Sequence, residues 1–283
     1  MIVVDRKTRE EFVYKPSWFV NFLYNNLVGR IILKLLSTRV IAKLGGLFMN
    51  SRLSKFMIKR TIKNYDMNMG LYEEKNYISY NDFFTRKLKD IVYDKKKTSF
   101  ISPCDSKLLA LKLDKDTSFN VKGSIYKAYE IIDNEIINEF YGGYALIFRL
   151  EVCDYHRYGY IDSGNREKYN YIKGKLHTVQ PIVYGKVNVF HHNSREWCVL
   201  HTENFGDIIQ CEVGAMMVGK IKNNYDLIEF KKGEEKGYFE FGGSTIILFL
   251  KNNVVDIDLD ILENSKLGKE TIVHYGERIG IKK

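Results

Sequence analysis

The sequence predicts an α+β protein in which basic amphipathic N-terminal helices are followed by a mostly antiparallel, β-rich domain. Residues 18–50 are strongly apolar with basic residues interspersed, whereas from residue 101 onward short apolar runs alternate with turns. The charged run 94–98 (DKKKT) separates the two sequence patterns. We therefore expect a helical region over residues 1–98 and a β-rich domain over residues 99–283.

The length suits one large domain or a domain with a helical appendage, and the chain can bury a sizeable core, because 45% of the 283 residues are apolar and 14% are aromatic. The net charge of +9 indicates an anionic partner, which on charge alone is a nucleic acid, an acidic membrane surface or an anionic substrate. No zinc-finger, P-loop or RNP-type motif is present, which argues against nucleic acid. The first eleven residues carry several charges and lack the apolar stretch of a signal peptide, so we expect a cytoplasmic protein.

The four cysteines show no metal-binding spacing, and we expect them to be reduced, mostly buried and not part of a metal site. They are Cys104, Cys153, Cys198 and Cys211.

Residues 18–36 predict one helix, and Ser37 and Thr38 predict the cap of a second helix that loosens near Gly45 and Gly46. Basic residues interrupt the apolar run, so no stretch is long enough to span a bilayer. Two interpretations remain open. The helices lie on a membrane surface, or they fold as a pair onto the core of the domain.

Residues 53–65 predict a further basic helix with Leu53, Phe56, Met57 and Arg60 on one face, and Asn81 is the expected cap of a short helix that runs to Leu88. Strands are expected in the apolar runs farther along the chain. These runs are 108–113, 144–150, 175–179, 197–202, 207–213, 215–221, 238–241 and 245–250.

The stretch 239–250 (FEFGGSTIILFL) combines a buried strand with two glycines and a Ser-Thr pair. Glycines inside a strand usually mark a bulge or a close approach to the backbone. A second interpretation is chemical, because the hydroxyl of Ser244 can reach the carbonyl of Gly243 if the backbone bends, and glycine tolerates such a bend. Both interpretations remain open at this point.

Two polar stretches complete the candidate site. Residues 102–107 (SPCDSK) place Asp105 in a turn, where a carboxylate commonly bonds backbone N–H groups. Residues 153–160 (CDYHRYGY) gather His156, an arginine and three tyrosines after a predicted buried strand, which is dense for a turn.

Taken together, these stretches resemble the phosphatidylserine decarboxylase family. The resemblance runs from about Phe83 to the C-terminus and rests on six short motifs in the family's order, any one of which is weak alone. The motifs are 81–88 (NDFFTRKL), 102–105 (SPCD), 154–157 (DYHR), 178–181 (TVQP), 203–206 (ENFG) and 242–245 (GGST), the last being the variant found in part of the family.

The resemblance implies a pyruvoyl-dependent enzyme. Ser244 would attack the carbonyl of Gly243, and β-elimination would then cut the chain between residues 243 and 244. The pyruvoyl group left at the start of residues 244–283 would form a Schiff base with phosphatidylserine and yield phosphatidylethanolamine and CO₂. The two chains, 1–243 and 244–283, would stay together.

The family's self-cleaving triad is Asp, His and Ser, and Asp105 and Ser244 match two of its positions. The family's His-Arg-x-His motif assigns its first histidine, here His156, to decarboxylation and its second to the triad. The second position is Gly159 in this chain. Three alternatives remain open. His177 replaces the missing histidine as the base, or His156 serves in both maturation and decarboxylation. In the third, the chain cleaves slowly or not at all and is a non-processing, lipid-binding relative.

The resemblance and the basic helices also imply partners and a location. We expect an anionic phospholipid membrane and phosphatidylserine as partners, a peripheral position on the cytoplasmic face of the cell membrane, and no nucleic acid. A homodimer remains open. A pyruvoyl decarboxylase of a soluble amino acid is a further hypothesis, which the apolar residues 18–50 disfavour because a soluble substrate does not need them.

Overall fold

The computed structural model describes residues 1–16, 18–36, 38–114, 116–121, 124–183, 188–215, 220–241 and 244–283. Its α-helices are α1 (Trp18–Asn25), α2 (Leu27–Leu36), α3 (Arg39–Asn50), α4 (Phe56–Asn64), α5 (Tyr80–Phe84), α6 (Ala128–Ile132), α7 (Val189–His192) and α8 (Leu259–Lys266). Short 3₁₀ helices are η1 (Arg52–Lys55), η2 (Met69–Leu71), η3 (Glu135–Phe140) and η4 (Pro181–Val183).

The first ten strands are β1 (Ile2–Asp5), β2 (Glu11–Val13), β3 (Ser99–Ile101), β4 (Ser106–Lys112), β5 (Ser118–Val121), β6 (Ser124–Lys127), β7 (Tyr144–Arg149), β8 (Arg157–Gly159), β9 (Gly164–Arg166) and β10 (Asn170–Ile172). The remaining strands are β11 (Arg195–Thr202), β12 (Gly206–Gly214), β13 (Ile221–Asn223), β14 (Glu229–Phe230), β15 (Glu235–Phe239), β16 (Ser244–Leu250), β17 (Val255–Ile257), β18 (Glu270–Val273) and β19 (Arg278–Lys282).

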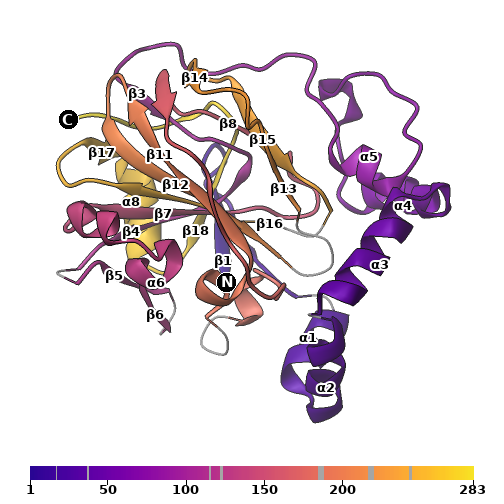
Figure 1. Ribbon diagram of the computed structural model, residues 1–283. Coiled ribbons are helices and arrows are strands. Elements are labelled where there is room, and N and C mark those ends of the chain that lie inside the picture. Colours follow the sequence, from indigo (N-terminus) through magenta and orange to yellow (C-terminus); the bar gives the residue numbers. More distant parts are fainter. Residues whose placement is uncertain are drawn as a thin grey trace.

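One large sheet organises the molecule (Figure 1). Within the described residues it has eleven strands in the order β14-β9-β11-β12-β16-β7-β4-β18-β1-β2, with β10 paired to β11. Its pairs are antiparallel except for the parallel pair of β1 and β18. The predicted α+β class with a mostly antiparallel sheet is therefore confirmed.

Strand β16 lies in the middle of this sheet and separates two apolar cores. Because side chains alternate along a strand, Ile247 and Phe249 enter the core on one face, whereas Ile246, Leu248 and Leu250 enter the core on the other. A strand buried on both faces needs a continuous apolar sequence, and this explains the uninterrupted run that predicted it.

The N-terminal helices differ in detail from the prediction. The expected single helix over 18–36 is broken at Asn26, whose Oδ1 accepts hydrogen bonds from the backbone N–H groups of Val28 and Gly29 and so caps α2. Helix α3 continues to Asn50, so the predicted loosening at Gly45 and Gly46 is wrong. Thr38 is its N-cap residue, and Ser37 lies outside the described residues.

The interpretation that these helices fold onto the core holds in part, whereas their position on a membrane surface stays a prediction. Val20, Leu23 and Tyr24 of α1 are buried in the main core, whereas Trp18 and Leu27 are exposed. Helices α1 to α5 extend along one side of the molecule (Figure 1), and no helix in the described part of the chain is both long and apolar enough to cross a membrane.

Two further predictions are wrong, and a third falls mostly outside the described residues. Ser79, not Asn81, caps α5, because its hydroxyl accepts from the N–H of Asp82, and α5 ends at Phe84 rather than Leu88. Residues 175–179 form no strand beyond an isolated bridge from Lys175 to Asn193. In the predicted run 215–221, residues 216–219 lie outside the described ranges, and β13 begins only at Ile221.

The division of the chain near residue 98 stays a prediction. β1 and β2 precede that point and belong to the large sheet through the pairing of β1 with β18.

Asn81 has a different role from the predicted cap, because its side chain joins two distant segments. Its Nδ2 donates to Asn50 Oδ1 (3.0 Å), and its Oδ1 accepts from the backbone N–H of Phe241 (2.9 Å). Asn81 thus ties the end of α3 to the segment that leads into β16.

We expect Asn81→Ala to lower the free energy of unfolding by about 2 kcal/mol, because it removes two hydrogen bonds at a buried position. Urea denaturation measures this. The matched control is Asn76→Ala, which removes an exposed contact to Lys55 and should stay within about 0.5 kcal/mol of the wild type. Equal effects of the two substitutions would mean that Asn81 does not join these segments.

Candidate active site

Ser244 is the first residue of β16 and stands between two neighbouring strands. It pairs with Gly214 of β12 on one side, and its carbonyl accepts from the N–H of Leu150, which follows β7, on the other (3.2 Å). The side chain is fully buried, and its Oγ has no hydrogen-bond partner among the described residues. A buried hydroxyl without a partner needs an explanation, and the hydroxyl of the adjacent Thr245 shares this feature. Gly242 and Gly243 lie outside the described residues.

His156 is also fully buried, and its hydrogen bond indicates its tautomer. Nδ1 lies 2.9 Å from the backbone carbonyl oxygen of Asp154. Because a carbonyl oxygen only accepts, we assign the ring proton to Nδ1, which leaves a lone pair on Nε2. Nε2 is buried and has no partner within the described ranges. Burial, and then the positive charge of Arg86, hold the pKa of His156 well below its usual value, so the ring is neutral.

Aromatic contacts place the His156 ring near the segment that leads to Ser244. The ring lies against Phe84 in a tilted arrangement, with 3.8 Å between the ring centroids, and the centroids of Phe84 and Phe241 are 5.2 Å apart. Phe241 precedes Ser244 by three residues. In addition, the N–H of Phe239 in β15 donates to the carbonyl of His156.

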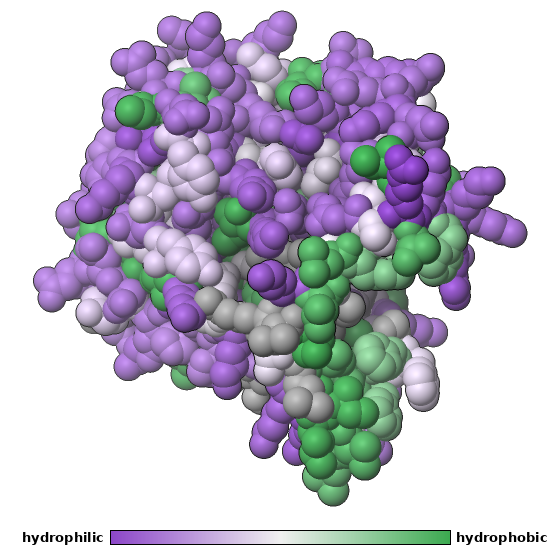
Figure 2. Space-filling model, turned by 45° about the vertical axis from the view of Figure 1, so that its right-hand side comes forward, coloured by the Kyte–Doolittle hydropathy of each residue, from purple (hydrophilic) through white to green (hydrophobic). Residues whose placement is uncertain are grey.

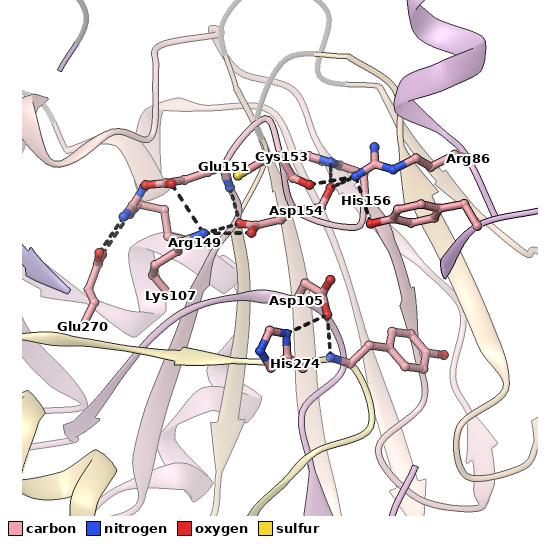
Figure 3. A network of polar contacts seen from close by, with 12 residues as sticks. Arg86, Asp105, Lys107, Arg149, Glu151, Cys153, Asp154, His156, Glu270 and His274 are labelled. Carbon is pink, nitrogen blue, oxygen red and sulfur yellow. Dashed lines mark hydrogen bonds and ion pairs between the residues drawn. The ribbon is translucent and has the colours of Figure 1, made fainter. Parts of the chain in front are cut away.

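The turn that carries His156 is held by charged groups (Figure 3). Lys107 Nζ lies 2.8 Å from both carboxylate oxygens of Asp154, and Asp154 Oδ2 also accepts from the N–H of Glu151. Arg86 Nη2 donates to the carbonyls of Cys153 and Asp154. These contacts determine the position of the carbonyl that orients the imidazole.

Asp105 lies at the same end of the large sheet as Ser244. It precedes β4, and β7 separates β4 from β16, so the two residues are about 10 Å apart by strand spacing. Asp105 Oδ1 accepts from the N–H of Tyr275 (2.8 Å) and lies 3.8 Å from His274 Nδ1. The nearby carboxylate of Asp105 raises the pKa of His274.

Asp105 is not joined directly to the other predicted site residues. In the part of the chain that the structure describes, no hydrogen bond or ion pair links it to Ser244, His156 or His177. The histidine that contacts Asp105 is His274, which the sequence motifs did not indicate.

The place next to Gly159 is filled. A Cβ at this position would overlap the hydroxyl of Tyr275 and lie 2.7 Å from its Cζ and 2.9 Å from the carbonyl oxygen of Glu234. The hydroxyl of Tyr275 donates to the carbonyl of Gly233 (3.1 Å). A side chain at position 159 therefore has no room while Tyr275 keeps this orientation.

His177 is linked to the strand beside Ser244 through Asn193. Asn193 Nδ2 donates to the carbonyls of His177 and Gly214, and Gly214 pairs with Ser244. The Nδ1 atom of His177 lies 3.5 Å from the hydroxyl oxygen of Tyr24. Burial lowers the pKa of His177.

A cavity of about 710 Å³ lies beside this end of the sheet. Its wall is largely apolar, with charged side chains from β4 and from the end of β7. Its lining includes Phe12, Phe19, Lys107, Arg149, Glu151 and Phe241.

Sequence reasoning missed Tyr275, Arg149 and Glu151. The importance of these residues is seen only from their neighbours in the structure. For example, nothing in the sequence around Tyr275 indicates a contact with Gly159.

We expect Gly159→Ala to destabilise the protein by about 1–3 kcal/mol, because the new methyl group overlaps the Tyr275 ring. Thermal or urea unfolding measures this. Gly70→Ala is the control, since its added Cβ meets only the side-chain oxygen of Asn68 at 3.1 Å.

A double-mutant cycle with Tyr275→Phe adds a second check on this contact. Gly159→Ala should cost less in the Tyr275→Phe background, where the overlapping hydroxyl is gone. Additive effects would mean that the two side chains do not compete for this space.

Comparison with known proteins identifies the family. Residues 80–281 match the family described as phosphatidylserine decarboxylase. The chain is 48% identical to phosphatidylserine decarboxylase proenzyme 2 of Clostridium acetobutylicum, over 99% of this chain and 98% of the relative. It is 43% identical to the phosphatidylserine decarboxylase proenzyme of Clostridium botulinum strain 657, over 94% of this chain and 93% of the relative. It is 42% identical to the phosphatidylserine decarboxylase proenzyme of Clostridium tetani, over 98% of this chain and 97% of the relative. The chain belongs to the phosphatidylserine decarboxylase family.

Proposed function

We propose that this chain decarboxylates phosphatidylserine to phosphatidylethanolamine through a pyruvoyl group made from Ser244. The observation that carries the proposal is the buried, unpartnered hydroxyl of Ser244 at the start of a central strand, directly after Gly242 and Gly243, in a member of this family. In the maturation step, Ser244 Oγ would attack the carbonyl carbon of Gly243 and lose its proton to a base, while the 243–244 amide bond breaks to leave an ester and a free amine on residue 244. β-Elimination would then release the carboxylate of Gly243 and leave dehydroalanine, which water converts to the pyruvoyl group with loss of ammonia.

We assign the base to His156. A general base needs an unprotonated acceptor, and Nε2 of the neutral ring is such an atom. The contacts through Phe84 and Phe241 link this ring to the segment that leads to Ser244. The family's second histidine is Gly159 here, and Tyr275 fills the adjacent space. His177 remains the second candidate, because Asn193 ties its backbone to the strand beside Ser244.

Asp105 has a positioning role in this proposal. Its carboxylate holds the backbone of Tyr275, and the Tyr275 side chain packs against Gly159 at the end of the strand that follows His156. Asp105 therefore acts on the His156 segment through Tyr275 rather than by direct contact with the imidazole.

The large cavity suits a lipid substrate. The pyruvoyl group supplies a carbonyl that accepts the substrate amine and takes up the electron pair left when CO₂ departs. The chain's own residues would enclose the substrate, with Phe12 and Phe19 on the apolar wall and Lys107 and Arg149 at the polar end. Phe241 also lines the cavity, so the cavity extends to the segment that precedes Ser244.

The helical side of the molecule suits a membrane surface. Figure 2 shows apolar side chains gathered over the projecting helices. The most exposed of them are Trp18, Leu27, Ile31, Leu47, Leu53 and Phe56. Exposed basic residues such as Arg30, Lys43, Lys55 and Lys59 accompany them, and each basic group near an anionic surface is worth about 1 kcal/mol. This supports peripheral binding at the cytoplasmic face of the cell membrane.

The two products of cleavage would remain associated. Of the strands within residues 244–283, β16 lies between β12 and β7, β18 between β4 and β1, and β19 pairs with β3. Separation would require the large sheet to be broken at two places.

We expect Ser244→Ala to leave the chain uncut and without decarboxylase activity, because both maturation and the pyruvoyl group depend on this side chain. Denaturing mass spectrometry detects the fragment 244–283, and CO₂ release from phosphatidylserine vesicles measures activity. Thr245→Val is the control, since it removes the adjacent buried hydroxyl and should still be cut. An uncut wild-type chain would favour the non-processing, lipid-binding alternative.

We expect His156→Gln to slow chain cleavage at least about a hundred-fold, the usual contribution of a general base, and His177→Gln to slow it less than about five-fold. In the wild type, burial and Arg86 keep the pKa of His156 below its usual 6.5, so the base is unprotonated at neutral pH. The cleavage rate should therefore stay level as the pH falls to about 6.5 and drop only at lower pH. A larger effect of His177→Gln would transfer the role to His177.

A further inference from the structure

Lys107, Arg149 and Glu151 form a charged cluster on the wall of the 710 Å³ cavity. The Glu151 carboxylate lies between the two cations, with Oε1 2.9 Å from Arg149 Nη1 and Oε2 3.4 Å from Lys107 Nζ. Figure 3 shows the charged ends of these side chains turned toward one another. The rest of the cavity wall is mainly apolar, so this cluster marks its polar end.

Both cations are held in place without Glu151. Arg149 forms two hydrogen bonds with the buried carboxylate of Glu270, at 2.9 Å and 2.6 Å. Lys107 is bonded to both oxygens of Asp154. In addition, the two residues are direct cross-strand neighbours in β4 and β7. Loss of Glu151 would therefore leave two positioned cations at the cavity wall.

Glu151 is the most exposed of the acidic partners of these cations. Its side chain is 23% exposed, whereas that of Glu270 is 1% exposed and that of Asp154 is 13% exposed. Burial disfavours ionisation of Glu151, but Lys107 and Arg149 outweigh it and hold its pKa below the usual value. The cavity thus contains an ionised carboxylate of the chain itself at a site that suits an external anion.

We infer that Lys107 and Arg149 form the subsite for the phosphodiester of a phospholipid headgroup, and that Glu151 occupies this subsite until the substrate displaces it. The inference rests on the proposed function for the identity of the lipid. A phosphodiester carries one negative charge shared by two non-bridging oxygens, and these oxygens match the guanidinium and ammonium donors.

The substrate's phosphodiester fits this subsite better than its carboxylate does. A carboxylate bound to two cations would be stabilised in the ground state, which opposes the loss of CO₂. The phosphodiester stays unchanged through the reaction, so strong binding of this group carries no such cost. The acyl chains would then lie along Phe12 and Phe19 on the apolar wall, toward the exposed apolar side chains of α1.

The test measures binding of soluble headgroups to the full-length chain carrying Ser244→Ala, so that its outcome does not depend on catalysis. Isothermal titration with glycerophosphoserine should show binding that is about five-fold tighter when Glu151→Gln is added, because the competing charge is removed and the shape is kept. Lys107→Met should weaken binding about ten-fold. Free serine, which lacks the phosphodiester, should bind no better after Glu151→Gln.

The matched control is Glu139→Gln, which removes a surface carboxylate that also pairs with a lysine, Lys251, and should leave binding unchanged. Unchanged or weaker binding of glycerophosphoserine to the Glu151→Gln chain would overturn the inference. A gain for inorganic phosphate without a gain for glycerophosphoserine would overturn it as well, because the site would then be a simple anion site. The proposed function is tested separately by CO₂ release from the processed wild type, so the two ideas can fail independently.

Discussion

The structure depends on the pairing of β16 on both of its sides. Backbone hydrogen bonds from β12 and β7 hold this strand along its length, and its side chains fill the cores on both faces of the sheet. Ser244 is therefore the first residue of a strand that is paired on both sides. Such a position suits a residue whose hydroxyl must meet a neighbouring backbone carbonyl, since a rigid strand limits the range of approach.

The same arrangement explains what the sequence could predict. Short-range patterns predicted the α+β class, the central strand at residues 245–250 and the apolar basic helices, because each depends on residues close together in the chain. The parallel pairing of β1 with β18 joins opposite ends of the sequence, and no local pattern indicates it. Residues 175–179 resembled a strand by apolar alternation, but side-chain bonds from Asn193 hold this segment instead of a ladder.

The candidate site shows the same limit. Ser244, His156 and Asp105 were predicted from motifs, and their roles remain predictions. The motifs could not show that Asp105 contacts His274 and the backbone of Tyr275. They also could not show that the position next to Gly159 is occupied, because Tyr275 comes from a distant part of the chain. In this chain the acid and the buried imidazole of the family's motifs belong to separate clusters.

The interleaving of residues 244–283 with the rest of the sheet has a thermodynamic consequence. While the chain is continuous, refolding is a unimolecular process and its equilibrium does not depend on protein concentration. After a cut before Ser244, β16 and β18 would belong to a different molecule from the strands that flank them. Unfolding would then release two chains, and reassembly would become bimolecular and concentration-dependent. The mature protein would therefore persist through a slow rate of unfolding rather than through reversible folding.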